Sequence, residues 1–454
     1  MADLIPERIH IIGAGGAGMS GLAKLLHQRG HRVTGSDLKP ARMLDALVDL
    51  DIDTWIGHAP DRIDQLDLVV ASSAVPESDP EIVAARSNGI PVWRRPMLLG
   101  ALTSSMPTTG VAGTHGKTTS TALLVTAMRA IGLDPSFLVG GELVGLNTGA
   151  HLSDRTRFVL EADEAFGTFR HLTLDSVLVT NIESDHLDHY GTLAALEDAF
   201  FQVVGGVEGP RIGCIDDPGV RRLAQRTALT TYGFDHSADW VVTEPRNDGG
   251  TSHFTVTGPD RRAIPVTLPK PGRHLAANTT GVLAMVEALG HDAAAAAEGL
   301  VDFSGVRRRY EIAAQLGGVT IVDDYAHHPT EVAATISAAR QGTDGAVIAV
   351  FQPHRYSRTA DLAPLFGVPL AMADRVIVTD VYPAGEPPII GVSGRIVADA
   401  VEAAGGTASY VPKVADVADR LEPMLRRGDT LLLLGAGDIN AIVDDIVTRI
   451  GVGS

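Results

Sequence analysis

Residues 109–119 read Thr-Gly-Val-Ala-Gly-Thr-His-Gly-Lys-Thr-Thr, a glycine-rich loop that ends in a lysine and two hydroxyl side chains. An apolar strand is expected just before the loop and a helix from about Lys117 onward. Successive backbone N–H groups in such a turn converge on phosphate oxygens, the ammonium bridges the outer phosphates, and the next hydroxyl ligates Mg2+. The loop therefore predicts an ATP site.

The match is to the shorter pattern Gly-Thr-x-Gly-Lys-Thr at 113–118, because Val111 stands where the longer eight-residue pattern requires glycine. Lysine is scarce in this chain, and Lys117 is the only one between Lys39 and Lys270. We expect an exposed loop lysine with little structural role. The alternative is a glycine turn that only starts a helix. The predicted ATP contacts in the loop are Gly113, Thr114, His115, Gly116, Lys117, Thr118 and Thr119.

Composition restricts the class of protein. The chain has 454 residues, of which 45% are hydrophobic, and a net charge of -18. Its length predicts two to four domains. The acidic balance argues against a nucleic-acid partner. Cys214 is the only cysteine, which excludes an internal disulfide. No apolar run approaches the length of a membrane span, and the N-terminus does not look like a signal segment, so we expect a soluble, cytoplasmic protein. A monomer or a homodimer is expected, and the sequence does not decide between them.

Short apolar runs alternate with amphipathic stretches along the whole sequence, which is typical of parallel sheets covered by helices. We expect an α/β protein of three domains: a Rossmann-like domain at 1–105, a P-loop ATPase-like domain at 106–308 and a second Rossmann-like domain at 309–454. Within the second domain, residues 240–268 look like an antiparallel patch. An alanine-rich stretch at 292–301 is expected to be helical.

A second glycine motif lies near the N-terminus. It reads Gly-Ala-Gly-Gly-Ala-Gly at 13–18, follows the expected strand at 8–12 and opens a helix, and Asp37 ends the next strand. This arrangement binds a pyrophosphate at a helix N-terminus, and NAD, FAD or a UDP-sugar fits equally. A plain tight turn is the alternative. The predicted contacts are Gly13, Gly15, Gly16, Ala17, Gly18, Met19, Ser20, Asp37 and, at the end of a later strand, Ser73.

Two acidic segments follow buried strands of the second domain. Glu161 ends the strand at 158–161 and begins Glu-Ala-Asp-Glu, where its oxygens suit Mg2+ together with the hydroxyl of Thr118. His186 lies in Ser-Asp-His-Leu-Asp at 184–188 and is a candidate ligand for a second cation. A solvated acidic loop and a structural histidine are the alternatives.

Two loops of the third domain carry Tyr, His and Arg side chains. The first reads Asp-Asp-Tyr-Ala-His-His-Pro at 323–329, and the second reads His-Arg-Tyr-Ser-Arg-Thr at 354–359. Each follows a strand, so both are expected to line one edge of a sheet, where such side chains bind carboxylates or phosphates. Helix capping and surface charge are the alternatives. The candidates are Asp324, Tyr325, His327, His354, Arg355 and Arg358.

Taken together, these motifs resemble the Mur ligases over essentially the whole chain. The family carries UDP on the first domain, ATP on the second and the incoming amino acid largely on the third. The resemblance implies that Thr118 and Glu161 hold one Mg2+, and that Glu161 and His186 hold a second. It also implies adenine contact by Asn278 and ATP contacts by Arg309 and Asp324.

Two departures from the family pattern limit this transfer. Ala165 and Phe166 follow Glu-Ala-Asp-Glu where the family often has Ser-Asp, and Leu275 stands where it commonly has the first of two asparagines. Members that add later amino acids use a carbamylated lysine near the second metal. No lysine lies at 118–269, which resembles the alanine-adding branch.

The implied reaction joins L-alanine to the lactyl carboxylate of UDP-N-acetylmuramate through an acyl phosphate, in peptidoglycan precursor synthesis. ATP and Mg2+ are the implied cofactors. Lys117, Glu161, His186, Arg355 and a histidine base are the implied catalytic groups; the sequence leaves open whether the base is His327 or His354. Rival interpretations are an NAD-dependent dehydrogenase, a non-enzymatic ATP switch, and another amide ligase of the folylpolyglutamate type.

Overall fold

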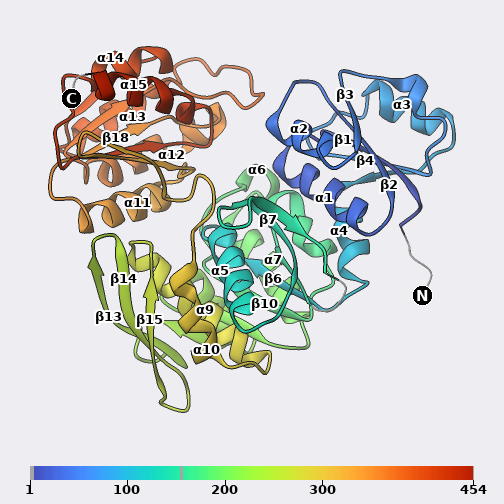
Figure 1. Cartoon of the computed structure of the whole chain (residues 1–454), viewed down its shortest axis with the longest axis horizontal. Coiled ribbons are helices and arrows are strands. Elements are labelled where there is room, and N and C mark those ends of the chain that lie inside the picture. Colours follow the sequence, from blue (N-terminus) through green and yellow to red (C-terminus); the bar gives the residue numbers. More distant parts are fainter. Residues whose placement is uncertain (1–4, 154–156, 453–454) are drawn as a thin grey trace. The chain divides into compact units, whose positions relative to one another are not determined.

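The computed structural model describes residues 5–153 and 157–452, which fold into two compact units (Figure 1). Each unit is described by itself. Unit 1 comprises Met1–Thr243, Thr255–Val266 and Ala277–Phe303, and unit 2 comprises Glu244–Phe254, Thr267–Ala276 and Ser304–Ser454.

The N-terminal sheet of unit 1 is parallel, with strand order β3-β2-β1-β4-β5. The order reverses between β1 and β4, and ligands of open α/β sheets bind at such a reversal. This confirms the expected Rossmann-like domain. Its elements are β1 (Arg8–Ile12), α1 (Ala17–Gln28), β2 (Arg32–Asp37), α2 (Arg42–Val48), β3 (Asp53–Ile56), β4 (Leu68–Ala71), α3 (Pro80–Ser87), β5 (Val92–Arg94) and α4 (Arg95–Thr103).

A ten-stranded sheet follows, in the order β15-β14-β13-β12-β11-β10-β6-β9-β7-β8. Strand β6 is buried throughout and pairs in parallel with β9 and β10. Its elements are β6 (Thr108–Ala112), α5 (Lys117–Ala130), β7 (Ser136–Leu143), β8 (Thr148–His151), β9 (Phe158–Glu161), β10 (Ser176–Val179), α6 (Leu187–Tyr190), α7 (Leu193–Gly205), β11 (Arg211–Cys214), α8 (Pro218–Ala224), β12 (Thr230–Gly233), β13 (Trp240–Asp248), β14 (Thr251–Thr257), β15 (Ala263–Leu268), α9 (Arg273–Ala288) and α10 (Ala293–Glu298).

The expected antiparallel patch corresponds to β13, β14 and β15. Only Gly249 and Gly250 separate β13 from β14, and both have positive φ, 55° and 87°. A two-residue connection joins antiparallel strands, and positive φ at both positions is the signature of a tight hairpin turn. The alanine-rich stretch is helical as expected, although it divides into α10 and a 3-10 turn at Gly299–Asp302.

Helix α1 connects the two sheets of unit 1 through one hydrophobic core. Buried residues of α1, including Leu22 and Leu26, pack in the same cluster as Leu138 and Phe158 of the second sheet. The helix approaches β7 so closely that a Cβ on Gly21 would lie 2.6 Å from Leu138 Cδ1. The N-terminus of α1 is thereby held near the middle of β7 and the carboxyl end of β9.

Unit 2 contains a six-stranded sheet in the order β16-β17-β21-β18-β19-β20, in which only the β16–β17 pair is antiparallel. Separate hydrophobic clusters cover its two faces. Strands β17 and β18 are parallel to β21, so both end at the same edge. The elements are β16 (Glu311–Leu316), β17 (Val319–Asp324), α11 (Pro329–Gln341), β18 (Val347–Phe351), α12 (Tyr356–Leu370), β19 (Arg375–Val378), α13 (Gly394–Ala403), β20 (Ala408–Tyr410), α14 (Val417–Leu421), β21 (Thr430–Leu434) and α15 (Val443–Val452).

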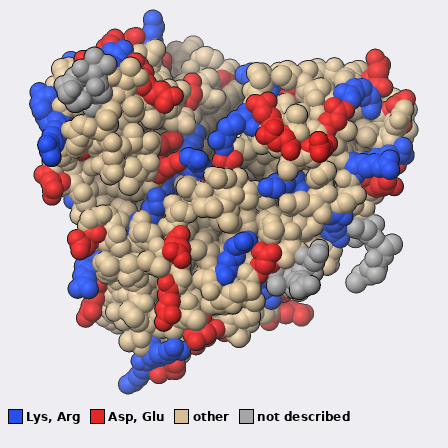
Figure 2. All heavy atoms as spheres, in the orientation of Figure 1, with Lys and Arg blue, Asp and Glu red and all other residues tan. Residues whose placement is uncertain are grey.

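Charged side chains of both signs are interspersed over the face drawn in Figure 2. None of the described helices combines the length and apolar character that crossing a bilayer requires.

Candidate functional site

The loop between β6 and α5 forms a cradle that only glycine permits. Gly113 and Gly116 have φ of 133° and 79°. A Cβ on Gly113 would lie 2.1 Å from Thr180 Oγ1, and one on Gly116 would lie 3.0 Å from Asn278 Nδ2. Gly116 also caps α5, so the backbone N–H groups of the first turn face the loop. The cradle fits a polyphosphate, and Asn278 lies against it.

The segment after β10 braces this cradle. Asn181 Oδ1 accepts from the N–H of His115 at 2.8 Å, and Thr180 Oγ1 donates to the carbonyl of His115 at 2.6 Å. The hydroxyl of Thr114 accepts from the N–H of Glu183 at 2.9 Å. The sequence Thr-Asn-Ile-Glu therefore holds the phosphate loop in shape from the neighbouring strand.

Lys117 is largely buried, with 13% of its side chain exposed, which corrects the expectation of an exposed loop lysine. Its ammonium donates to the Glu164 carboxylate at 2.8 and 3.0 Å and to the carbonyl of Gly113 at 2.7 Å. Burial lowers the pKa of Lys117, but the charges of Glu164 and Asp163 outweigh burial and leave it above its ordinary value. The lysine stays charged and neutralises a carboxylate that is 1% exposed.

Candidate metal ligands surround this ion pair. Asp163, Glu164 and His186 each offer one ligand atom, and these atoms lie within 4.8 Å of one another. Glu161 lies at the end of β9, where it accepts from the N–H of Gly140 at 2.5 Å. Thr118 is in the first turn of α5 and is 6% exposed. These oxygen and imidazole donors fit a divalent cation.

In the N-terminal sheet, the glycine motif forms the turn between β1 and α1. Asp37 ends β2 and accepts from the N–H of Gly15 at 2.9 Å, so the carboxylate shapes the turn. Gly16 is the N-cap of α1, whose first turn has no acidic residue. Met19 is 3% exposed within that turn, and the Ser20 hydroxyl donates to the carbonyl of Ala17 at 3.1 Å.

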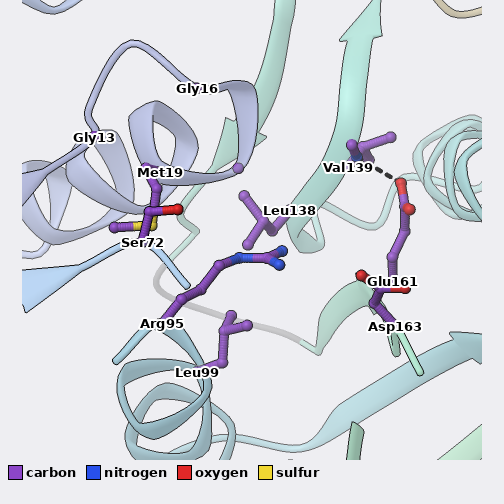
Figure 3. A pocket seen from close by; sticks show the side chains of 12 residues that line it. Gly13, Gly16, Met19, Ser72, Arg95, Leu99, Leu138, Val139, Glu161 and Asp163 are labelled. Carbon is purple, nitrogen blue, oxygen red and sulfur yellow. Dashed lines mark hydrogen bonds between the residues drawn. The ribbon is translucent and has the colours of Figure 1, made fainter. Parts of the chain in front are cut away.

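A cavity of about 290 Å³ lies within unit 1, between this turn and the acidic end of β9 (Figure 3). Ser72 lines it, whereas the sequence pointed to Ser73. Strand β4 ends at Ala71, earlier than expected. The lining residues are Gly13, Gly16, Gly18, Met19, Ser72, Arg95, Leu99, Leu138, Val139, Gly140, Glu161 and Asp163.

Arg95 is a cavity residue that sequence reasoning missed. It begins α4, and its side chain extends into the cavity between Leu138 and Leu99 (Figure 3). It lies within the Arg-Arg-Pro run at 94–96, which matches no general binding pattern.

In unit 2, the loops after β17 and β18 lie together, as expected from the parallel strands. The rings of His327 and His354 have centroids 6.0 Å apart. Asp324 is 7% exposed and accepts from the N–H groups of Tyr310 and Ala326, both at 2.8 Å. Burial raises the pKa of Asp324 to about 6, although it lies near Arg309.

The two histidines are neutral at physiological pH. Burial lowers the pKa of His327 to about 4 and that of His354 to about 3, and the positive charge of Arg358 acts in the same direction on both. His327 Nδ1 lies 2.9 Å from the carbonyl oxygen of Tyr325. Because a carbonyl only accepts, Nδ1 carries the proton, and Nε2 is left as a base.

Arginines complete this edge. The guanidinium of Arg309 lies 4.9 Å from the centre of the Tyr325 ring. Arg355 has a φ of 68° and donates to Glu386 at 2.6 Å, so it is held within the loop of β18. The edge therefore combines neutral bases with fixed cations, an arrangement suited to an amino acid carboxylate and amine.

Three α/β sheets, with a loop shaped for a polyphosphate after a central strand of the second sheet, are typical of multidomain nucleotide-binding proteins. Three protein-family models match the sequence. They are described as "Mur ligase family, catalytic domain" at 8–106, "Mur ligase middle domain" at 111–286 and "Mur ligase, glutamate ligase domain" at 308–437. The chain belongs to the Mur ligase family.

Similar proteins cover nearly the whole chain. UDP-N-acetylmuramate--L-alanine ligase of Mycolicibacterium vanbaalenii is 41% identical, covering 98% of this chain and 96% of that protein. The enzyme of the same name from Kineococcus radiotolerans is 42% identical, covering 97% and 95%. The crystal structure of UDP-N-acetylmuramate-alanine ligase from Thermotoga maritima superposes with a TM-score of 0.83 at 27% identity, covering 98% and 100%.

The Lys117–Glu164 pair predicts a stability cost on mutation. Lys117→Ala leaves a buried carboxylate without its counter-ion, so the free energy of unfolding is expected to fall by about 3 kcal/mol. Chemical denaturation followed by circular dichroism measures it. The double variant Lys117→Met/Glu164→Met removes both charges and recovers most of the loss, while both variants lose phosphate release. If Lys117→Ala is as stable as wild type, Lys117 has no structural role.

The largely buried His327, with 17% of its side chain exposed, predicts that stability depends on pH. Its pKa is about 4 in the folded protein against an ordinary 6.5, so between these values the unfolded state binds more protons and stability falls with falling pH. His327→Gln removes the imidazole and with it this contribution to the pH dependence of stability. As the pH is lowered from about 7.5 to about 5, the unfolding free energy of the variant should therefore rise by about 2 kcal/mol relative to that of wild type. Denaturant titrations at both pH values test this, and a constant difference contradicts the burial argument.

Proposed function

We propose that the chain is an ATP-dependent ligase that joins L-alanine to the lactyl carboxylate of UDP-N-acetylmuramate, with release of ADP and phosphate, in peptidoglycan precursor synthesis. The observation that carries this proposal is the match of 41% identity, across 98% of the chain, to a protein of that name. The glycine loop at 113–119 and the N-terminal glycine turn at 13–18 support the proposal, because each is shaped to accept phosphates of a nucleotide.

Amide formation from a carboxylate requires activation, because an unmodified carboxylate oxygen is a poor leaving group. The carboxylate oxygen attacks the γ-phosphorus of ATP, the bond to ADP breaks, and an acyl phosphate forms. The uncharged amine of alanine then attacks the carbonyl carbon, and phosphate leaves with the former carboxylate oxygen. Positioning and neutralisation of the anions are the protein's main contribution.

We assign the phosphates of ATP to the loop at 113–119, with the adenine near Asn278. Lys117 exchanges one partner for another, because its ammonium leaves Glu164 for the outer phosphates. Thr118, Glu161 and His186 are the proposed Mg2+ ligands, and the Glu164 carboxylate lies 4.0 Å from Nε2 of His186. Bound Mg2+ supplies additional positive charge against the phosphate oxygens.

The amino acid is assigned to the edge formed by the loops of β17 and β18. His327 is the better candidate for the base, because its hydrogen bond to the Tyr325 carbonyl leaves Nε2 unprotonated. A base at Nε2 takes the proton from the alanine ammonium. Tyr325, Arg355 and Arg358 orient the substrate, and Arg309 and Asp324 are proposed to contact ATP.

We further propose domain boundaries at 105/106 and 308/309, a cytoplasmic location and a monomeric or homodimeric state.

Phosphate release tests the function directly. Purified protein with ATP and Mg2+ is expected to release phosphate only when UDP-N-acetylmuramate and L-alanine are both present, and mass spectrometry should show the new amide. Serine and glycine are tested in parallel to define side-chain selectivity. ATP hydrolysis that ignores both substrates points to the ATP-switch interpretation, and binding of NAD without ATP turnover points to the dehydrogenase.

The metal assignment predicts a changed Mg2+ requirement. Glu161→Gln keeps the hydrogen bond with the Gly140 N–H but removes the charge, so half-maximal activity should need about 10-fold more Mg2+ or more. Asp134→Asn, an exposed carboxylate paired with Arg129, serves as the matched control and should leave the titration unchanged. Equal Mg2+ titrations for Glu161→Gln and wild type remove Glu161 from the metal site.

A further inference from the structure

Arg95 is a cationic side chain for which the described residues provide no complete set of partners. Its Nε atom is buried and has no hydrogen-bond partner among them. A guanidinium carries five N–H donors, and a buried donor left unpaired is costly. Nevertheless the side chain extends into the cavity of unit 1 instead of turning to solvent (Figure 3). This placement indicates a ligand that supplies the missing acceptors.

The neighbour of Arg95 on one side is the first turn of α1. A Cβ on Gly18 would lie 3.4 Å from Nε and from Nη2 of Arg95, so the guanidinium is packed against the helix backbone. The N-cap Gly16 has no side-chain capping bond, and no acidic residue lies in the first turn of this 12-residue helix. The helix N-terminus and the guanidinium thus present positive charge to the same space.

Carboxylates lie on the other side of the cavity. Glu161 and Asp163 line it together with Arg95. An anion at the α1 turn would be repelled by these carboxylates, and Arg95 stands where it screens that repulsion.

We propose that Arg95 binds the diphosphate of the UDP-sugar substrate, acting with the N–H groups of the first turn of α1. This inference rests on the proposed function and adds a named contact to it. Arginine suits the role because its planar fork donates to two phosphate oxygens at once.

The test is isothermal titration of Arg95→Ala with UDP and with uridine. Loss of a bidentate charge-assisted contact should raise the Kd for UDP about 10- to 100-fold, while the affinity for uridine stays at the wild-type value. Arg95→Lys, which retains charge without the fork, should lie between wild type and Arg95→Ala. Arg86→Ala is the matched control, because Arg86 is an exposed arginine of the same domain that pairs with Glu77, and it should bind UDP normally.

Three outcomes overturn the proposal. In the first, Arg95→Ala binds UDP as tightly as wild type. In the second, its affinities for uridine and UDP fall equally and its melting temperature falls, which marks a structural residue. In the third, it binds UDP normally and only its affinity for UDP-N-acetylmuramate falls, which assigns Arg95 to the lactyl carboxylate. Failure of the proposed function looks different, because wild-type protein would then bind neither UDP nor the muramyl nucleotide.

Discussion

Charge repulsion is the constraint on which this structure depends. Glu161, Asp163 and Glu164 are gathered at the end of β9, directly beside a loop shaped for a polyphosphate. Lys117 makes this arrangement stable, because its ammonium contacts Glu164 at 2.8 Å while its chain belongs to the phosphate loop. The same cation that stabilises the folded protein is thus placed to neutralise the ligand. When a phosphate replaces Glu164 as the partner of Lys117, the ammonium keeps a counter-ion. The lysine is therefore paired both without and with the ligand.

The backbone around Lys117 is rigid, so the position at which a phosphate would replace Glu164 is fixed. The loop of Gly113 and Gly116 is held by side chains of the neighbouring strand end, and a Cβ on Gly113 would overlap Thr180. Helix α1 is fixed in the same way against Leu138. The two glycine turns of unit 1, to which we assign phosphates, are therefore positioned by the packing of buried elements. A rigid site of this kind reduces the entropy that bound substrates must lose before they react.

Much of this organisation could be predicted from sequence, because strand, glycine turn and helix follow one another locally. The turn at 13–18, the loop at 113–119 and the shared edge of His327 and His354 all follow from that rule and from the parallel direction of the strands. The burial of Lys117 could not be predicted, since Glu164 is 47 residues away. Arg95 was missed because no spacing relates the start of α4 to Gly18. Whether Ser72 or Ser73 lines the cavity depends on where β4 ends, and the ends of helices and strands are the least predictable features of a fold.

The acyl phosphate is the central claim, and oxygen isotope transfer tests it most directly. UDP-N-acetylmuramate carrying 18O in both lactyl carboxylate oxygens is incubated with ATP, Mg2+, L-alanine and the protein, and the released phosphate is analysed by mass spectrometry. Attack of the carboxylate on the γ-phosphorus predicts one 18O in each phosphate and one retained in the amide carbonyl. Phosphate released with no 18O, alongside the amide product, would contradict the account.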